Sequence, residues 1–243
     1  MQKNLIEIFS SIQGEGKYVG ARQIFVRFEG CNLACAYCDT ENTPGRHPVC
    51  LVETGAGSRV FDRLRNPLSP TVVADCIHRL ARKVRHQAVS FTGGEPLLSA
   101  DFIHALRPLV DLPFFLETNG TLPDLLAQIL PDVDIISMDI KLPSTTGQPT
   151  WEAHRAFLRL AREKDFYVKL VVSADTTEQE FSQAVSLVAE NAPEALFIIQ
   201  PVTPVGDVAP ASPEQILTCQ NVALAQLHDV RVIPQTHKMI GQR

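Results

Sequence analysis

The sequence predicts an α/β protein whose mostly parallel sheet curves into an incomplete (partial) TIM-like barrel. Short apolar runs alternate with amphipathic stretches along the whole chain, which is the pattern of repeated β/α units. We count about six units, whereas a complete barrel has eight and typically needs about 250 residues. A flat doubly wound sheet remains an alternative, because strand periodicity does not reveal whether a sheet closes.

Seven short apolar runs are predicted as strands, and the amphipathic stretches between them as helices. The strands are expected at 24–28, 88–92, 114–118, 133–140, 166–172, 196–200 and 230–233. The helices are expected at about 71–86, 99–110, 122–130, 151–163, 178–190 and 213–227. Ser69 and Ser212 each precede a proline, and Thr177 precedes two glutamates, so these three residues are predicted to cap the helices that follow them.

Residues 41–70 carry turn-forming residues and no sustained period. We expect an irregular insertion there, with room for one short helix, and loops of that length inside compact domains are usually functional. No internal repeat or low-complexity tract is present. Residues 1–243 are therefore expected to form a single domain that carries this insertion.

The composition excludes several classes of protein. A hydrophobic fraction of 45% in 243 residues is enough to bury a core, so a disordered or fibrous chain is not expected. The net charge of −5 offers no general attraction to nucleic acid or to anionic lipid. No apolar run approaches the roughly 18 residues of a membrane span, and residues 1–16 do not resemble a signal peptide. We expect a cytoplasmic protein with no nucleic-acid or membrane partner.

Six cysteines are present, and three of them, Cys31, Cys35 and Cys38, lie within eight residues. In a long chain without an export signal, reduced thiols are expected, and a reduced cluster of this kind indicates a metal site. One possibility is a structural zinc site with Cys50 or His47 as the fourth ligand, which would make the chain a zinc-stabilised binding module. The other is a 4Fe-4S cluster with one iron left open to bind a ligand.

Polar residues follow the predicted strands, where active sites of parallel α/β proteins lie. The first strand is followed by the three cysteines, and Gln200 ends the sixth. The strands between them are followed by Thr92 to Glu95, by Glu117 to Gly120, and by Ser137, Asp139 and Lys141. We expect these residues to share one cleft. Asp139 and Lys141 lie two apart on one strand face, and the simpler interpretation is that they only pair with each other.

Two of these motifs together resemble the radical S-adenosylmethionine (SAM) superfamily. They are the CX3CX2C run with Tyr37 before its last cysteine and the Gly-Gly-Glu-Pro run at 93–96. The resemblance implies a radical SAM core in which Cys31, Cys35 and Cys38 hold a 4Fe-4S cluster and the free iron binds SAM. The reduced cluster then releases a 5′-deoxyadenosyl radical that abstracts hydrogen from the substrate. Gly94 and Glu95 are implied to lie at the methionine part of SAM.

Four further stretches, at 7–16, 25–31, 38–40 and 231–238, resemble the 7-carboxy-7-deazaguanine synthase family. This resemblance implies a lyase that converts 6-carboxy-5,6,7,8-tetrahydropterin to 7-carboxy-7-deazaguanine with loss of ammonia, on the pathway to queuosine in tRNA. It also implies magnesium, a homodimer, SAM as a reusable cofactor and an electron donor such as flavodoxin or ferredoxin.

The family pattern assigns most of the strand-end residues. It implies that the pterin substrate contacts Ile12, Gln13, Gly14, Glu15, Arg27, Thr92 and His237. It implies SAM contacts at Gly94, Glu95, Ser137, Asp139 and Lys141, and a magnesium ligand at Thr40. No residue is expected to act as a general acid or base, because the cluster and SAM carry the chemistry. Where the family has a Ser-Pro-Lys type of stretch, this chain reads Ser-Met-Asp-Ile-Lys.

A glycyl-radical enzyme activase is the alternative within the superfamily. It would use the same cluster and SAM but would need neither the Gln-Gly-Glu segment nor Thr40. Both enzyme hypotheses require that Cys50 is not a cluster ligand, since a fourth cysteine would occupy the open iron. Cys76 and Cys219 fall in predicted helices and are expected to be buried.

Overall fold

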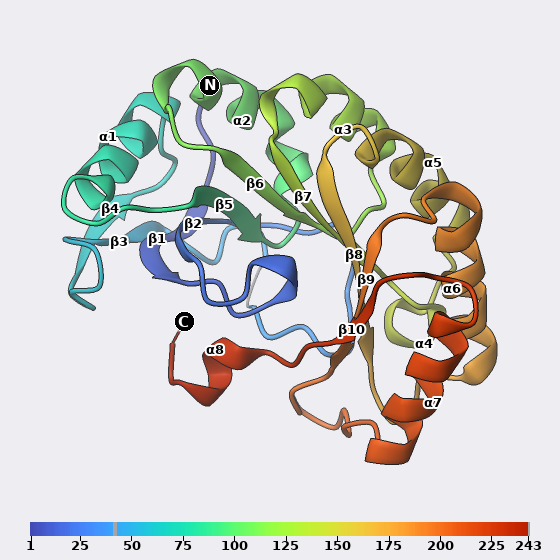
Figure 1. The fold of residues 1–243 in the computed structure, drawn as a ribbon. Helices are drawn as coiled ribbons and strands as arrows, with labels where there is room; N and C mark the ends of the chain where they lie inside the picture. The colour runs from blue at the N-terminus through green and yellow to red at the C-terminus, as the bar shows by residue number, and fades with distance from the viewer. Residues whose placement is uncertain (41–42, 243) are drawn as a thin grey trace.

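The computed structural model describes residues 1–40 and 43–242, and its strands form one curved sheet (Figure 1). The strand order is β10-β9-β8-β7-β6-β5-β2-β1-β3-β4. Seven strands run parallel in chain order: β2 (Arg22–Phe28), β5 (Ala88–Gly93), β6 (Phe114–Thr118), β7 (Ile135–Ile140), β8 (Asp165–Val172), β9 (Leu196–Pro201) and β10 (Val230–Val232). These are the seven strands predicted from the sequence.

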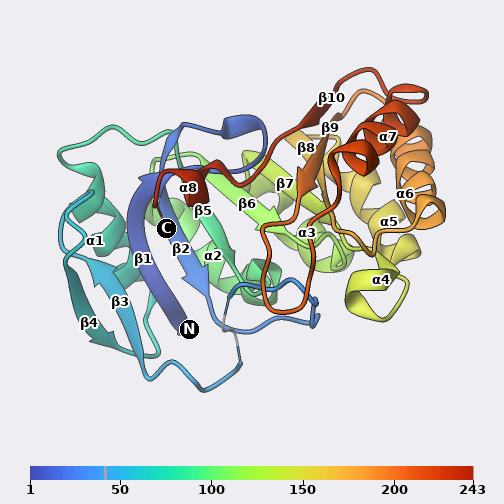
Figure 2. The same ribbon diagram turned by 90° about the horizontal axis from the view of Figure 1, so that it is seen from below.

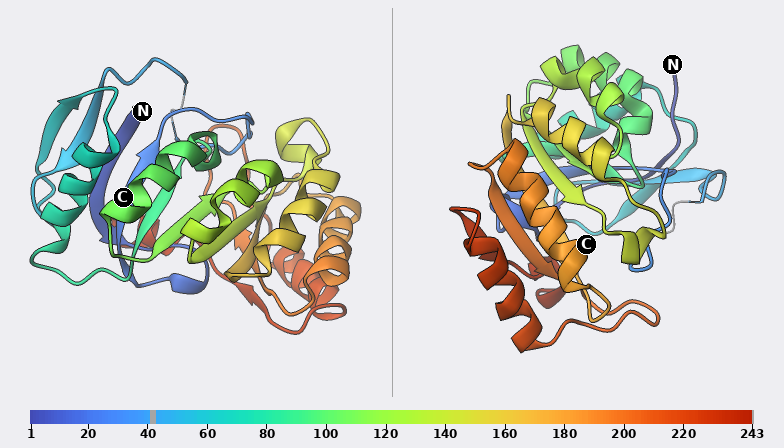
Figure 3. Two further views of the ribbon diagram at one scale, coloured as in Figure 1. Left: turned by 90° about the horizontal axis from the view of Figure 1, so that it is seen from above. Right: turned by 90° about the vertical axis from the view of Figure 1, so that its right-hand side faces the viewer.

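The sheet does not close, because β10 and β4 are its two free edges. An incomplete barrel is therefore confirmed. The buried strands β5 to β9 carry near-continuous apolar runs because both of their faces are covered. In Figures 1 and 3 the helices lie along the outer, convex side, and the concave side faces the loops and the C-terminal segment.

The outer layer consists of the six predicted helices. They are α1 (Pro70–Ala81), α2 (Ala100–Leu106), α3 (Pro123–Ile129), α5 (Trp151–Ala161), α6 (Glu178–Asn191) and α7 (Pro213–Leu224). The three predicted caps are present, and Thr177 forms a full capping box with Glu180. Helix α1 ends at Ala81 rather than at 86, since the basic residues that follow supply no apolar face to bury.

Short helices lie in the connections. They are α4 (Pro143–Thr146), α8 (Thr236–Met239) and the 3₁₀ helices η1 (Gly16–Tyr18), η2 (Pro96–Ser99), η3 (Arg107–Leu109) and η4 (Leu130–Asp132). In the part of the chain that the structure describes, no helix combines the length and the apolar character needed to cross a membrane.

Three strands were not predicted, and they extend the sheet beyond β2. Strand β1 (Leu5–Ile12) is antiparallel to β2 and parallel to β3 (Val49–Glu53), and β4 (Phe61–Arg65) pairs with β3 as a hairpin. The prediction of an irregular insertion over 41–70 is thus wrong for β3 and β4, while residues 41 and 42 lie outside the described residues. Strand β4 is an exposed edge with three charged residues, so it carries no apolar period.

The core has two unequal parts. The larger part fills the space between the sheet and the outer helices. The smaller part closes the concave side near the amino ends of the strands and consists of Ala88, Phe115, Ile135, Tyr167, Leu196 and Ile198. Tyr18 of η1 packs edge-on against Phe115 and seals this end. Beyond this smaller part of the core, toward the carboxyl ends of the strands, the concave side is polar and contains a cavity.

Candidate active site

A cavity of about 230 Å³ opens at the carboxyl ends of the parallel strands. Its wall comes from β5 to β9 and from the segment after β1. It also includes the loop after β2 that carries Cys31, Cys35 and Cys38 (the cysteine loop) and the segment after β10 (the C-terminal segment). Of the predicted site residues, the wall includes Ile12, Gln13, Gly14, Glu15, Arg27, Cys31, Cys35, Cys38, Thr40, Thr92, Gly94, Ser137, Asp139, Lys141 and His237. One cleft therefore contains residues that are more than 200 positions apart in the chain.

The three cysteines of the motif lie in the loop after β2 and are free thiols. Burial raises the pKa of Cys31 and Cys35, while Cys38 is exposed. The backbone N–H of Leu33 and the side-chain amide of Asn119 donate to Cys31 Sγ, at 3.4 and 3.9 Å. Thiolates that accept N–H donors and face a cavity suit an iron-sulfur cluster.

A zinc site does not fit this arrangement. Among the described residues, no three His, Cys, Asp or Glu side chains are close enough together to hold one metal ion. Cys50 lies on β3 in the apolar core and is not part of the cavity wall, and His47 is not part of it either. The zinc-stabilised module thus lacks its fourth ligand, and the requirement that Cys50 stay away from the cluster is met. Cys76 and Cys219 are buried, as predicted.

Gly93 and Gly94 allow β5 to turn against the backbone of the cysteine loop. Gly93 has a φ of 124°, and a Cβ on Gly94 would lie 1.8 Å from the carbonyl oxygen of Gly30. Gly94 also lines the cavity, so its backbone offers a surface that a ligand can approach closely. This cradle beside the free thiols fits a bound SAM.

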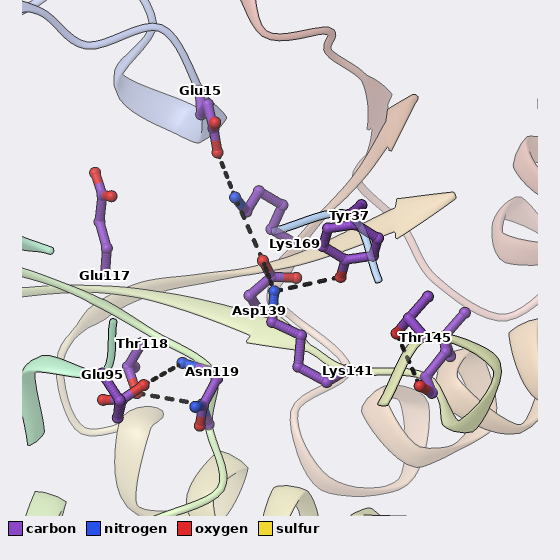
Figure 4. A network of polar contacts seen from close by, with 12 residues as sticks. Glu15, Tyr37, Glu95, Glu117, Thr118, Asn119, Asp139, Lys141, Thr145 and Lys169 are labelled. Atoms are coloured by element: carbon purple, nitrogen blue, oxygen red, sulfur yellow. Dashed lines mark hydrogen bonds and ion pairs between the residues drawn. The ribbon is translucent and has the colours of Figure 1, made fainter. Parts of the chain in front are cut away.

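Glu95 is the exception among the predicted site residues, because it is buried behind the cavity wall (Figure 4). Its carboxylate accepts hydrogen bonds from the backbone N–H groups of Leu97 and Asn119 and from Thr118 Oγ1, at 2.8 to 3.0 Å. Burial raises its pKa to about 7 despite these donors. The side chain of Glu95 thus points away from the cavity and holds the strand ends together, and the expected contact between residue 95 and SAM stays a prediction.

The segment after β1 forms the opposite side of the cavity. Gln13 Nε2 donates to Gln23 Oε1 at 3.0 Å and to Glu117 Oε1 at 2.7 Å, and Gln13 Oε1 accepts from the backbone N–H of Glu15. Thr92 Oγ1 donates to the second oxygen of Glu117 at 2.8 Å. Two predicted substrate residues are thus fixed by the carboxylate of Glu117, which was expected in the cleft but was given no specific role.

A row of alternating charges crosses the cavity from this segment to the cysteine loop (Figure 4). Glu15 pairs with Lys169, whose Nζ lies 3.5 Å from Asp139 Oδ2, and Lys141 Nζ lies 2.7 Å from the same oxygen. Lys141 also donates to the hydroxyl of Tyr37 at 3.3 Å. Asp139 and Lys141 do pair, as the simpler interpretation held, but both also line the cavity.

The charges in this row shift each other's pKa values. Burial alone would raise the pKa of Glu15, but Lys169 and Gln235 lower it to about 2. Burial alone would lower the pKa of Lys169, but Glu15 and Asp139 raise it well above its ordinary value. Glu15 and Lys169 are therefore held in their charged forms at neutral pH.

Two buried oxygens of the cavity wall have no hydrogen-bond partner among the described residues. They are Asp139 Oδ1 and Gln200 Oε1. A buried acceptor without a donor costs about 1 to 3 kcal/mol unless a ligand or water satisfies it. The cavity thus presents two acceptors to a ligand that carries hydroxyl or amine donors, which again fits SAM and a polar substrate.

Arg27 and the C-terminal segment complete the wall. Arg27 Nε donates to Glu7 Oε1 at 2.9 Å, and its Nη1 lies 3.5 Å from Thr40 Oγ1. In Figures 1 and 2 the segment after β10 crosses back toward β1 and ends near it in α8. It brings His237 against Gly14, where an added Cβ would lie 2.1 Å from His237 Nδ1.

Several residues of the wall were not assigned from the sequence. They include Lys169, Glu117, Thr118, Asn119, Gln235, Val202, Thr203 and Val205. Lys169 had a usable signal, because it is a lone charge inside the apolar strand 166–172. Gln235 lies within the 231–238 stretch but its contact with Glu15 joins residues 220 apart, which no local pattern reveals.

The fold, the cysteine loop and the glycine cradle define a radical SAM protein, and comparison with known families agrees. The sequence pattern of the radical SAM superfamily matches residues 25–188, so the chain belongs to this superfamily. Its members use a 4Fe-4S cluster and SAM.

Relatives place the chain more narrowly. The 7-carboxy-7-deazaguanine synthase of Geobacter sulfurreducens is 42% identical, with 98% of this chain and 97% of the relative covered. The synthase of Archaeoglobus fulgidus is 37% identical over the full length of both chains. The crystal structure of QueE from Escherichia coli shares the fold, with a TM-score of 0.64 at 20% identity over 98% of this chain and 95% of that one. The chain belongs to the 7-carboxy-7-deazaguanine synthase family.

Proposed function

We propose that this protein is a radical SAM lyase that converts 6-carboxy-5,6,7,8-tetrahydropterin to 7-carboxy-7-deazaguanine with loss of ammonia. The observation that carries the proposal is one cavity that contains the cysteine loop, Gly94 and the Gln13–Glu15 segment together. When bound, the reduced cluster and SAM supply the one-electron chemistry that removes a hydrogen atom from the substrate. The residues of the chain bind and orient the two ligands.

On the cofactor side, Cys31, Cys35 and Cys38 would ligate the cluster, and the backbone at Gly94 would receive the methionine part of SAM. Ser137, Asp139 and Lys141 would contact the rest of SAM. The support for this assignment is that all of them line the cavity and that Asp139 Oδ1 is an acceptor without a donor. A vicinal diol such as a ribose carries the donors that this oxygen lacks.

On the substrate side, Ile12, Gln13, Gly14, Glu15, Thr92 and His237 would surround the pterin. Arg27 would bind its carboxylate, since a guanidinium is a permanent, forked donor for that group. Arg27 uses Nε for Glu7, and its Nη1 faces Thr40 across the cavity wall. Arg27 also lines the cavity, which supports this assignment.

Thr40 would contribute an oxygen ligand to magnesium. Its hydroxyl lies 3.4 Å from Asp39 Oδ1 in the cavity wall. Magnesium typically takes one or two protein oxygens and completes its shell with water and substrate, which suits a site with so few protein ligands. Electrons would come from a small donor such as flavodoxin or ferredoxin. We also propose a single domain, a homodimer and a cytoplasmic location, where the free thiols stay reduced.

The decisive experiment is an anaerobic assay of reconstituted protein with SAM, magnesium, reductant and 6-carboxytetrahydropterin, with the ring-contracted product followed by mass. We expect product that depends on all three cysteines. Alanine at Gln13, Arg27 or Thr40 should lower product formation and leave the iron content and SAM binding unchanged. Lys17→Ala is the matched control, because Lys17 forms an exposed ion pair with Asp165 and is not part of the cavity wall.

Three results would contradict the proposal. Full activity in all three alanine variants would show that the substrate side is assigned wrongly. Release of 5′-deoxyadenosine without product would keep the radical chemistry but would exclude this pterin as the substrate, and a glycyl-radical activase would then be tested next. Colourless protein with one zinc per chain would exclude both the lyase and the activase.

A further inference from the structure

Lys169 connects two carboxylates that belong to different sides of the cavity. Its Nζ donates to Glu15 Oε2 in the segment after β1 and lies 3.5 Å from Asp139 Oδ2 on β7. Its side chain is only 12% exposed. A lysine buried to this degree on a strand needs compensation, and the two carboxylates provide it.

Neither carboxylate depends on Lys169 alone. Asp139 Oδ2 also accepts from Lys141 Nζ at 2.7 Å, and Glu15 Oε1 accepts from Gln235 Nε2 at 2.7 Å. What Lys169 adds is the connection between them. In Figure 4 the row runs from Glu15 through Lys169 and Asp139 to Lys141 and the hydroxyl of Tyr37, in the cysteine loop.

We propose that Lys169 is a positioning residue that fixes the substrate-binding segment 13–15 relative to the SAM-binding strand β7. This role rests on the proposed function. Hydrogen abstraction requires the reacting atoms to be held about 3 to 3.5 Å apart, and a displacement of about 1 Å can cost a hundredfold in rate. A short ion-pair bridge across the cavity is a direct way to hold that separation.

The test compares Lys169→Met with wild type and with Lys17→Met, which removes a lysine from an exposed ion pair outside the cavity wall. We expect Lys169→Met to lower kcat/KM for the pterin about 10- to 100-fold, as is typical when a supporting residue of a site is lost. The diagnostic readout is the ratio of 5′-deoxyadenosine released to product formed. It should rise, because the radical forms but meets a misplaced substrate. SAM binding, measured by calorimetry without substrate, should not change.

Two more variants separate positioning from simple stability. Lys169→Arg keeps the charge and should recover most of the coupling between SAM cleavage and product. Adding Lys169→Met to Glu15→Gln should cost much less than the same change in wild type, because the bridge is already broken on the Glu15 side. The double variant also removes one charge of each sign, so the buried pair leaves no unpaired ion behind.

An unchanged ratio of 5′-deoxyadenosine to product in Lys169→Met would overturn this role, even if turnover fell. Equal losses from Lys169→Met in the wild-type and Glu15→Gln backgrounds would overturn it as well, since the lysine would then not act through Glu15. In both cases wild-type product formation still supports the proposed function. If wild type makes no pterin product, the proposed function fails, and the role of Lys169 falls with it.

Discussion

The two sides of the cavity each bury one glutamate, and their pKa values move in opposite directions. Glu15, on the substrate side, faces Lys169, and its pKa is about 2. Glu95, behind the cysteine loop, accepts from two backbone N–H groups and one hydroxyl, and burial raises its pKa to about 7. The Glu95 residue is 1% exposed and the Glu15 side chain 21% exposed. The difference shows that a charged partner outweighs desolvation at Glu15, whereas the hydrogen-bond donors at Glu95 do not.

This contrast extends to how each side is built. The substrate side is held by ion pairs and side-chain hydrogen bonds around Glu15 and Gln13. The cysteine side is held by backbone packed on backbone, with Gly94 against Gly30. We therefore expect substitutions that remove a charge to disturb the substrate side, and substitutions that add volume to disturb the cysteine side.

Loss of a cysteine should have the largest effect. Replacing Cys31, Cys35 or Cys38 with Ala should abolish the iron cluster, SAM cleavage and product together, because a cluster ligand is lost. Glu15→Gln should reduce product but leave SAM cleavage. The measurement is iron content, 5′-deoxyadenosine and product for each variant. Equal loss of SAM cleavage in the cysteine variants and in Glu15→Gln would contradict the distinction between the two sides of the cavity.

The next largest effect is expected from Gly94→Ala. The new methyl group would lie 1.8 Å from the Gly30 carbonyl oxygen, so the backbone of the cysteine loop must shift, at a cost of about 3 kcal/mol in the free energy of unfolding. At Gly14 the obstacle is His237, whose Cβ would lie 2.4 Å from the new methyl group and cannot be moved by side-chain rotation, so the partly exposed segment that carries His237 must shift. Gly14→Ala should cost about 1 kcal/mol, because this segment is less tightly packed than the buried backbone at Gly30. Urea unfolding of both variants measures this, and equal values would contradict it.

Glu15→Gln should lower the free energy of unfolding by about 2 kcal/mol, because Lys169 loses a charged partner but keeps Asp139. Urea unfolding at pH 7 measures the change. As a control, Asp165→Asn breaks an ion pair that is about two-fifths exposed, and it should cost well under 1 kcal/mol. A cost for Glu15→Gln as small as that of the control would mean that the Glu15–Lys169 pair adds nothing to the free energy of unfolding.

The smallest expected effect is a difference in pH dependence. The folded-state pKa of Glu95 is raised from 4.5 to about 7, so the folded protein holds this proton more tightly than the unfolded chain. Its contribution to stability is complete below pH 4.5 and is lost as the pH rises through 7. Wild type should therefore lose about 1 kcal/mol relative to Glu95→Gln between pH 6 and pH 7. Unfolding at the two pH values measures this.

Glu15 should show the opposite dependence. Its folded-state pKa is lowered from 4.5 to about 2, so its contribution is present above pH 4.5 and is lost as the pH falls toward 2. Wild type and Glu15→Gln should thus converge in stability on acidification. Parallel pH profiles for the Glu15 and Glu95 variants would show that the two carboxyls do not differ in the way the structure indicates.

The sequence was most informative where burial and chain order agree. The seven parallel strands were predicted to within two residues at their ends, because each is a short apolar run. Most of the polar residues that follow these strands share one cleft, as expected, but Glu95 does not line it. Strand β4 was missed because an exposed edge strand has no apolar alternation to detect.

Only the site residues at strand ends and in local motifs could be predicted from the sequence. Cys31 and Gly94 belong to local motifs, so both were found. Lys169 and Gln235 owe their roles to Glu15, which is 154 and 220 positions away in the chain. The motif at 93–96 indicates the neighbourhood of Glu95 but not the direction of its side chain, which three donors behind the wall determine.

The contacts made by the C-terminal segment also constrain the order of folding. Thr236 donates to the carbonyl of Gly14, and Gln235 to Glu15, across separations of 222 and 220 residues. Contacts this distant in sequence form late, because the closure of so long a loop must be offset by structure that already exists. During synthesis the outer helices and the parallel strands can assemble one after another from the N-terminal side. The substrate wall cannot be complete before residue 236 has been synthesised, so the binding site is among the last parts of the molecule to form.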